Sequence, residues 1–441
     1  MKRYDAVIIG AGVAGLAAAQ RLLARGRSVA VLEARNRIGG RVWTIHVPEL
    51  TSPIELGAEF LHADARESRT LARRAGLTVV DIGGERRMSR EGELRRAPGF
   101  EKRVERLLGR FRDDLKDDRS VADALAAMRS LKSEDKLLAT RFVEGFHAAD
   151  TDRISERSLA GSADDPDTMR IARVGGGYDQ LVNALAESSR KHVHLDHVVS
   201  RITWRRGDAV ITSHSASGSA NADIGARNVV VTVPLGVLQA GQDSAGAVRF
   251  DPAVPSVDSA VQGLVMGGVF RIAIRFDAPF WTSSRFSKRH WGGQFNDMTF
   301  VQSLEPLPFP VWWTTYPLET PMLVGWSGGP NAWKLAGKTP DEISDSAVRS
   351  LARVFGMTRQ SVERHVVAAF THDWLTDPYS RGAYSYVLVG GSAASAVLAR
   401  AIERTLYFAG EHASTGRNGT VDGAISSGFR AAGQLLRNAP G

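Results

Sequence analysis

The sequence contains no cysteine. This absence excludes disulfides, thiolate metal sites, cysteine nucleophiles and any cofactor attached through a cysteine thioether. The chain also lacks an apolar run of about eighteen residues, the length needed to span a membrane. The first predicted strand begins at Tyr4 with no charged and apolar leader before it. We therefore expect no membrane span and a cytoplasmic location.

Clusters of one charge sign are also missing, although the net charge is +8. Basic residues alternate with acidic ones, as between Glu101 and Arg119, which is typical of solvated helix faces. A nucleic-acid-binding protein would present a clustered basic face, so we expect no nucleic-acid partner. No histidines and acids have the spacing of metal ligands, and we predict no metal site.

At 441 residues with 43% hydrophobic content, the chain can form more than one domain. An apolar run at residues 4–9, a helical stretch at 13–23 and a second apolar run at 28–32 predict a parallel βαβ unit. The pattern from Leu71 to Asp165 is helical and rich in charge, which indicates a helical insertion. Strand-like segments follow at 229–233, 269–276, 311–316 and 322–326, and residues 405–441 read as strand, glycine-rich loop and helix. No repeat or low-complexity linker is present, which favours interleaved domains.

A glycine motif follows the first strand directly. Gly10, Gly12 and Gly15 form GxGxxG, which permits a tight turn, a close approach to a pyrophosphate and packing of helix on strand. Glu33 ends the second strand, where an acid accepts hydrogen bonds from ribose hydroxyls. A carboxylate there disfavours the 2′-phosphate of NADP, so the motif predicts FAD or NAD.

The segment that favours FAD over NAD reads EARNRIGGRVW, from Glu33 to Trp43. Gly39 and Gly40 allow a second close backbone approach, and Arg41 supplies a cation for phosphate. The alternative is an ordinary turn followed by a surface arginine.

Longer strings resemble the flavin-containing amine oxidases, a family with monoamine oxidases, polyamine oxidases and lysine-specific histone demethylases. They are IIGAGVAGLAAAQRL, VLEARNRIGGR, IELGAEFLH, VGGGYDQL, VVTVPLGVL, RFDAPFW, DPYSRGAYSYV and LYFAGEHASTGRNGTVDGAISSGFRAA, in that order along the whole chain.

The resemblance implies an FAD site, and without cysteine the flavin is expected to be non-covalent. The implied ADP and phosphate contacts are Gly10, Gly12, Gly15, Glu33, Arg35, Gly39, Gly40 and Arg41. The remaining implied contacts are Gly57, Ala58 and Glu59 beside the flavin ring, Val199 at the adenine, Gly410 and Glu411 at the pyrophosphate and ribityl chain, and Thr420 and Val421 at the start of a helix near the pyrimidine end.

The resemblance also implies the chemistry. The flavin N5 takes a hydride from the carbon next to the amine nitrogen, the resulting imine is hydrolysed to an aldehyde, and O2 reoxidises the flavin to give H2O2. The implied partners are a small-molecule amine and O2, and a homodimer is a possible assembly.

Arg271 departs from the family pattern. It stands five residues before Phe276, where the family usually has a lysine that holds a water beside flavin N5. Arginine keeps the charge but cannot act as a base. Three interpretations of Arg271 remain. The protein is an oxidase with altered reactivity towards oxygen, or it is a dehydrogenase or a carboxylate-binding enzyme, or Arg271 is a strand residue paired with an acid.

The predicted substrate walls also differ from those of monoamine oxidases. Tyr386 matches one of the two aromatic walls, whereas Thr420 occupies the place of the other. Trp374 aligns with a family tryptophan near the flavin, and His62 aligns with a histidine of the polyamine oxidase pocket. Tyr386 and Trp374 could also be core aromatics, and His62 a loop histidine. The half-formed aromatic cage favours a polyamine or another extended amine over a small arylalkyl amine.

We therefore predict an α/β fold with a Rossmann-like FAD-binding domain of the GR2 type and an interleaved α+β substrate domain containing a mixed sheet. The predicted FAD domain comprises residues 1–75, 170–250 and 375–441, and the substrate domain comprises 76–169 and 251–374. The predicted function is FAD-dependent oxidation of an amine, with Arg271, Tyr386, Trp374, His62 and Thr420 at the reaction site. Alternatives are an L-amino acid oxidase, a flavin-dependent dehydrogenase or desaturase of a biosynthetic intermediate, and a flavin-bound scaffold without activity.

Overall fold

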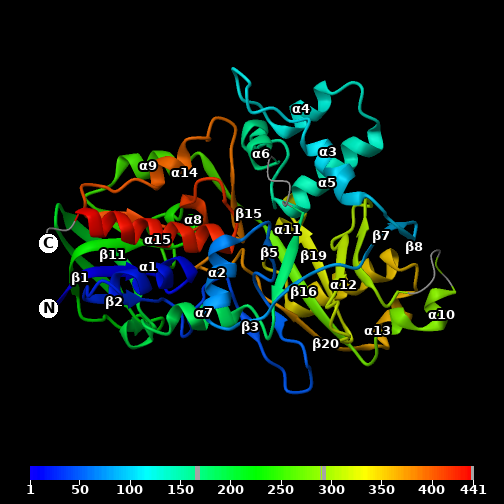
Figure 1. Ribbon diagram of the computed structural model, residues 1–441, viewed down its shortest axis with the longest axis horizontal. Helices are drawn as coiled ribbons and strands as arrows, with labels where there is room; N and C mark the ends of the chain where they lie inside the picture. Colours follow the sequence, from blue (N-terminus) through cyan, green and yellow to red (C-terminus); the bar gives the residue numbers. More distant parts are fainter. Residues whose placement is uncertain (164–168, 289, 291–294, 439–441) are drawn as a thin grey trace.

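The computed structural model describes residues 1–163, 169–288, 290 and 295–438. Two lobes lie side by side, and both ends of the described chain belong to the same lobe (Figure 1). We refer to this lobe as the nucleotide lobe and to the other as the substrate lobe. No helix in the described ranges combines the length and apolar character needed to cross a bilayer.

The nucleotide lobe contains an 8-stranded sheet built from distant parts of the chain. Its central strand β1 (Lys2–Ile9) pairs in parallel with β2 (Val29–Leu32) and with β13 (Ile224–Val231). The parallel neighbours β10 (Val193–His194) and β22 (Leu406–Phe408) lie beyond β2 and β13. The rest of the sheet consists of β12 (Asp208–His214), β11 (Val198–Arg205) and β14 (Arg249–Asp251). The predicted βαβ unit is confirmed.

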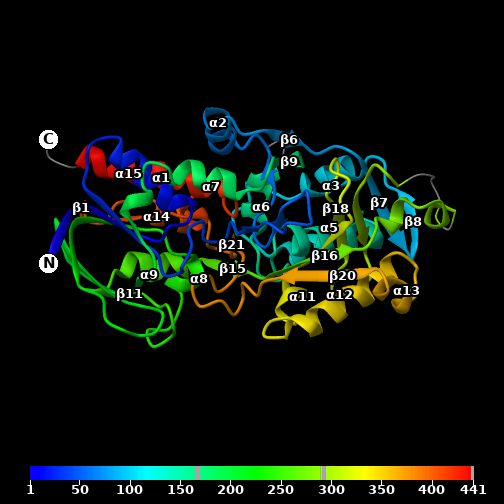
Figure 2. The same ribbon diagram turned by 90° about the horizontal axis from the view of Figure 1, so that it is seen from below.

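Helices cover both faces of this sheet, as expected for parallel strands that are apolar throughout. Along β1, Ala6 and Ile8 enter one core, whereas Val7 and Ile9 enter the opposite core. Figure 2 shows α1 (Val13–Leu23), α7 (Asp179–Ala186) and α15 (Val421–Asn438) on one face, and α8 (Leu235–Leu238) and α9 (Pro255–Val261) on the other. The parallel strands at the centre of the sheet are therefore buried between two helical layers, whereas β11 and β14 keep exposed residues.

The substrate lobe is built around a second, mixed sheet. Strands β20, β16, β19, β18, β17, β7 and β8 follow one another across it, with β17 and β7 parallel and the other pairs antiparallel. Their bounds are Val366–Thr371, Val269–Phe276, Met322–Gly328, Val311–Thr314, Met298–Ser303, Glu85–Arg90 and Glu93–Arg96. One face packs on α12 (Pro340–Val354), whose first turn is closed by a capping box between Thr339 and Glu342.

The helical insertion is confirmed only in part. Helices α3 (Phe100–Leu108), α4 (Val121–Ala127), α5 (Ser133–Phe146) and α6 (Glu156–Ala163) share one core above the second sheet (Figure 1). However, residues 79–96 form β6 (Val79–Asp81), β7 and β8, where the sequence predicted helix. The charged side chains of β7 hide its strand pattern, because Arg86 stacks on Phe100 and Phe300 and Arg87 is fully buried.

Short elements connect the lobes. Strand β15 pairs with β21, and β5 and β6 flank β9. The remaining elements are β3 (Thr44–Ile45), β4 (Ile54–Glu55), β5 (Leu61–His62), α2 (Arg66–Arg74), β9 (Ile171–Val174), η1 (Arg190–His192), β15 (Leu264–Gly267), η2 (Phe280–Thr282), α10 (Ser284–Ser287), α11 (Pro330–Trp333), α13 (Arg359–Glu363), β21 (Tyr384–Val387), α14 (Ala394–Leu398) and η3 (Glu411–Ala413). The predicted fold class, an α/β dinucleotide-binding domain with a mixed-sheet companion, is confirmed.

Candidate active site

A continuous cavity of about 850 Å³ runs from the glycine loop of the nucleotide lobe to helix α5 of the substrate lobe. Its volume lies in the upper part of the range for cofactor and ligand pockets. Nearly all of the predicted site residues line it, although they come from distant chain segments. They are Gly10, Gly12, Glu33, Arg35, Gly39, Gly40, Arg41, Gly57, Ala58, Glu59, His62, Val199, Arg271, Trp374, Tyr386, Gly410, Glu411, Thr420 and Val421.

The glycine loop supports a dinucleotide in the way that its spacing predicts. Gly10 has a φ of 104°, and a Cβ on Gly15 would lie 2.0 Å from the Gly10 carbonyl oxygen, so Gly15 serves packing rather than the cavity wall. A Cβ on Gly12 would meet no protein atom within 4 Å. Gly12 is also the N-cap of α1 and has no side chain to cap it, so the free N–H groups of α1 are available to an anion.

Glu33 is buried at the end of β2 and held by the backbone. One carboxylate oxygen accepts a hydrogen bond from the Ala11 N–H at 2.7 Å, and the other accepts one from the Arg35 N–H at 3.0 Å. These bonds fix the carboxylate at the edge of the cavity, where a ribose would meet it.

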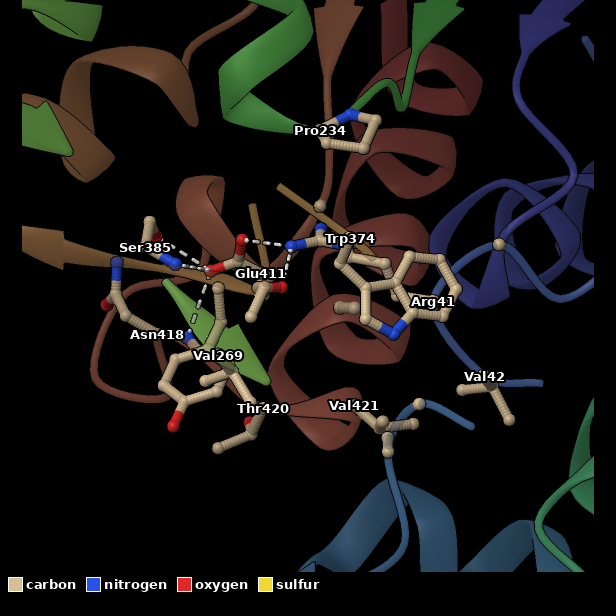
Figure 3. Close-up of a pocket in the computed structure, with 18 of the residues that line it drawn as sticks. Arg41, Val42, Pro234, Val269, Trp374, Ser385, Glu411, Asn418, Thr420 and Val421 are labelled. Carbon is tan, nitrogen blue, oxygen red and sulfur yellow. Dashed lines mark hydrogen bonds and ion pairs between the residues drawn. The ribbon is translucent and has the colours of Figure 1, made fainter. Parts of the chain in front are cut away.

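Arg41 and Glu411 form an ion pair across the cavity wall, with 3.0 Å between Nη1 and Oε1. The other carboxylate oxygen of Glu411 accepts hydrogen bonds from the Ser385 hydroxyl at 2.7 Å and from the Gly419 N–H at 3.1 Å (Figure 3). Burial acts to raise the pKa of Glu411, but the Arg41 cation, His412 and the hydrogen bond from Ser385 together hold the pKa below its usual value. Glu411 thus ties the Gly39–Arg41 turn to β21 and to the loop before α15.

Thr420 caps helix α15. Its hydroxyl accepts a hydrogen bond from the Gly423 N–H at 2.9 Å and donates one to the Arg417 carbonyl at 2.8 Å. Figure 3 shows Thr420 and Val421 side by side at the start of this helix. The helix N-terminus therefore faces the cavity, where its partial positive charge would stabilise an anion.

Arg271 lies on β16 with 5% of its side chain exposed, and it is paired with an acid. Its Nη2 lies 2.6 Å from the Oε2 of Glu59, and its Nη1 donates to the Gly57 carbonyl at 3.2 Å. Glu59 is also bound by Arg173 at 2.6 Å and by the Trp313 Nε1 at 3.0 Å. Burial raises the pKa of Glu59, but the two arginines hold it below its usual value. The arrangement matches the reading of Arg271 as a strand residue paired with an acid.

The predicted aromatic residues are both buried and at the cavity wall. The Trp374 Nε1 donates to the Leu56 carbonyl at 2.8 Å, next to the Gly57–Ala58 backbone. Tyr386 lies on β21 and packs into the core beneath α5. The structure therefore combines the two roles, core residue and cavity wall, that the sequence left as alternatives.

Sequence reasoning missed the far end of the cavity, which α5 supplies. Phe142 and Phe146 stack on each other with 5.0 Å between ring centroids, and His147 follows them as the C-cap. Phe300, Gln302, Trp313 and Trp326 of the second sheet complete this end. The one sequence signal for this end of the cavity was the adjacent pair Phe146 and His147, at the end of a helix rich in charged residues.

The dinucleotide-binding sheet and a cavity that leads into an aromatic chamber define an FAD-dependent oxidoreductase. A family model for flavin-containing amine oxidoreductases matches residues 13–436. The chain belongs to this family, and its cofactor is FAD.

The chain is also similar to amine oxidases in sequence, and it shares its fold with solved structures. Polyamine oxidase 4 of Oryza sativa is 28% identical, covering 98% of this chain and 88% of that protein. Lysine-specific histone demethylase 1 homolog 3 of Arabidopsis thaliana is 27% identical over 98% of this chain, which spans only 30% of that protein. Putrescine oxidase bound to putrescine superimposes with a TM-score of 0.79 at 22% identity, covering 99% of both chains. Cyclohexylamine oxidase from Brevibacterium oxydans gives 0.78 at 24% identity, covering 98% of this chain and 99% of the other.

Proposed function

We propose that the chain oxidises an extended amine, such as a diamine or polyamine, at a carbon next to nitrogen and uses O2 as the electron acceptor. The observation that carries the proposal is the continuation of the cavity beyond Gly57 and Ala58 into a chamber of aromatic side chains. FAD supplies, when bound, a two-electron acceptor that takes a hydride and passes both electrons to O2. The product imine takes up water to give an aldehyde and an amine or ammonia.

The chain's own residues orient the amine and exclude water. The chamber walls include Phe60, Phe146 and Tyr386, and burial in such surroundings favours the neutral amine, whose nitrogen lone pair is needed for oxidation. Arg271 contributes a guanidinium group that its ion pair with Glu59 holds in place at the cavity wall.

Anaerobic titration of the yellow protein tests the proposal, followed by readmission of air. The donors are diamines and polyamines, arylalkyl amines and L-amino acids. We expect extended amines to bleach the flavin absorbance and air to restore it with release of H2O2. Bleaching without rapid recovery in air would make the protein a dehydrogenase. Absence of bleaching by any amine would overturn amine oxidation.

L-Amino acids serve as the discriminating donors. An enzyme that binds a carboxylate through Arg271 needs the guanidinium Nη atoms free, yet Nη2 is paired with Glu59 and Nη1 with the Gly57 carbonyl. We therefore expect L-amino acids to bleach the flavin much more slowly than extended amines. Homodimerisation stays a prediction, which light scattering on the purified protein tests.

A further inference from the structure

Two histidines lie together at the far end of the cavity. His62 ends β5 and His147 caps α5, and both line the cavity. The ring of Phe146 contacts both imidazoles edge to face, with centroids 5.4 Å from His62 and 5.2 Å from His147. Within the described residues, His62 Nδ1 and His147 Nε2 are buried and have no hydrogen-bond partner. Because buried polar atoms in proteins are nearly always bonded, two such atoms in one cavity indicate a missing polar ligand.

Both imidazoles are neutral at physiological pH. Burial lowers the pKa of His62 to about 4. Burial, together with repulsion from His62, lowers the pKa of His147 to about 4. A neutral imidazole has one N–H donor and one acceptor nitrogen, so each ring can accept a hydrogen bond without repelling a cation.

The position of His147 is fixed by bonds to the end of α5. The Tyr384 hydroxyl donates to the Phe146 carbonyl at 2.8 Å, and the Trp326 Nε1 donates to the Gly145 carbonyl at 2.8 Å. The His147 N–H donates to the Val143 carbonyl at 3.1 Å. These bonds hold the backbone that carries the imidazole in place before a ligand arrives, which reduces the entropy lost on binding.

The carboxylates of the described cavity wall are already engaged. Glu59 is held by two arginines, Glu411 by Arg41 and Ser385, and Glu33 by backbone N–H groups. The two remaining acids, Asp64 and Asp422, both pair with Arg417.

The arginines at the far end of the cavity are paired in turn. Arg141 is bound to Glu144 at 3.0 Å, and Arg86 is bound to Glu101 at 2.9 Å. Among the buried side-chain atoms of the described cavity wall that lack a hydrogen-bond partner, only the imidazole nitrogens of His62 and His147 can accept a hydrogen bond, because the others are arginine nitrogens.

We propose that His147 accepts a hydrogen bond from a second substrate nitrogen, remote from the carbon that is oxidised, and so extends the pocket in which the family resemblance already places His62. The substrate class is then an amine with two or more nitrogens, and His147 is a specificity-determining residue. This inference rests on the proposed function, since it assumes that an amine occupies the cavity.

The experiment compares kcat/KM for α,ω-diamines with that for alkylamines of equal carbon number. In His147→Phe the ring volume is kept and the acceptor is lost, whereas His147→Asn restores an acceptor. His46→Phe is the matched control, because His46 is exposed and pairs with Asp179 outside the cavity. Flavin content of each variant is measured from its absorbance spectrum.

We expect the diamine-to-monoamine ratio of kcat/KM to exceed one in the parent protein and to fall about tenfold in His147→Phe, mainly through KM. It should recover in part in His147→Asn and stay unchanged in His46→Phe. If monoamines are oxidised but the ratio is the same in His147→Phe, the role of His147 is overturned while amine oxidation stands. If no amine is oxidised, the proposed function and the role of His147 are overturned together.

Discussion

The Nη2 atom of Arg271 on β16 lies 2.6 Å from the Oε2 atom of Glu59, which lies in the segment between β4 and β5. Arg173 binds the other oxygen of the same carboxylate, so one buried acid holds two buried cations. Removal of one partner of a buried ion pair leaves the charge of the other partner uncompensated. We therefore expect the Arg271–Glu59 pair to stabilise the folded protein as well as to form part of the cavity wall.

Substitution of Glu59 tests this connection. We expect Glu59→Gln to lower the free energy of unfolding by about 3 kcal/mol, because Arg271 and Arg173 then share no anion. Urea unfolding of the holoprotein gives this value. Glu363→Gln removes one of the two acidic partners of the exposed Arg359, the other being Asp345, and should change stability far less. Equal losses in the two variants would contradict a buried, shared carboxylate.

Gly12→Ala should separate folding from cofactor binding. The added methyl group meets no protein atom, and the φ of −70° at Gly12 suits alanine, so the apoprotein should unfold at the same urea concentration. The methyl group points into the cavity and should weaken FAD binding by at least tenfold, measured by fluorescence titration of the apoprotein. Gly83→Ala is the control, since its methyl group is equally unobstructed and lies away from the cavity wall. Unchanged FAD affinity in Gly12→Ala would place the pyrophosphate elsewhere.

The cap of α15 should affect both stability and the flavin. Thr420→Ala removes the hydroxyl that accepts from the Gly423 N–H and should cost about 1 kcal/mol, whereas Thr420→Ser should cost little. Thr339→Ala removes the cap of α12, far from the cavity wall, and should cost a similar amount. The flavin absorbance spectrum should shift in Thr420→Ala alone. A spectral shift in Thr339→Ala as well would show that general loosening, rather than the cap, is responsible.

Stability should fall as the pH drops from about 6.5 towards 4. Burial lowers the pKa of His62, His147 and His412 to about 4, below the value of about 6.5 in an unfolded chain. In this window the unfolded state binds more protons, so each histidine can remove up to about 1.4 kcal/mol of stability per pH unit. Burial raises the pKa of Glu55 to about 7. Between about pH 7 and 4.5 the folded state therefore binds more protons at Glu55 than the unfolded state, and this group increases stability as the pH falls.

Urea unfolding of the holoprotein at several pH values measures the net slope. We expect His147→Phe to reduce the loss of stability at low pH, because one buried neutral histidine is removed. Glu55→Gln should increase that loss, because the opposing group is removed. Identical slopes in the parent protein and both variants would show that these groups titrate normally in the folded state.

The sequence predicted the parts of the site that depend on neighbouring residues. GxGxxG and Glu33 belong to one βαβ unit, whose hydrophobic pattern and glycine spacing are readable without the rest of the fold. The strands at residues 269–276 and 322–326 were predicted for the same reason, since the strand-like alternation of each lies within a few consecutive residues.

The parts that depend on distant contacts were not predicted. Strand β7 was missed because Arg86 and Arg87 are charged, and their guanidinium groups lie over the rings of Phe100, Phe300 and Phe295, which come from other parts of the chain. His147 was missed because it becomes a cavity residue only when β19 and β21 fix the end of α5. The choice among readings of Arg271 required the position of Glu59.

The contact between α1 and α15 has a consequence for synthesis on the ribosome. A Cβ on Gly428 would lie 2.1 Å from the Ala14 carbonyl oxygen, so the first and last helices of the nucleotide lobe pack backbone to backbone. Strand β22, which pairs with β13, also comes from the last part of the chain. The glycine loop is therefore translated first, but the lobe around it is complete only when α15 has left the exit tunnel. We expect nascent chains that stop before Val421 to hold no FAD, and cofactor loading to require that α15 has been made.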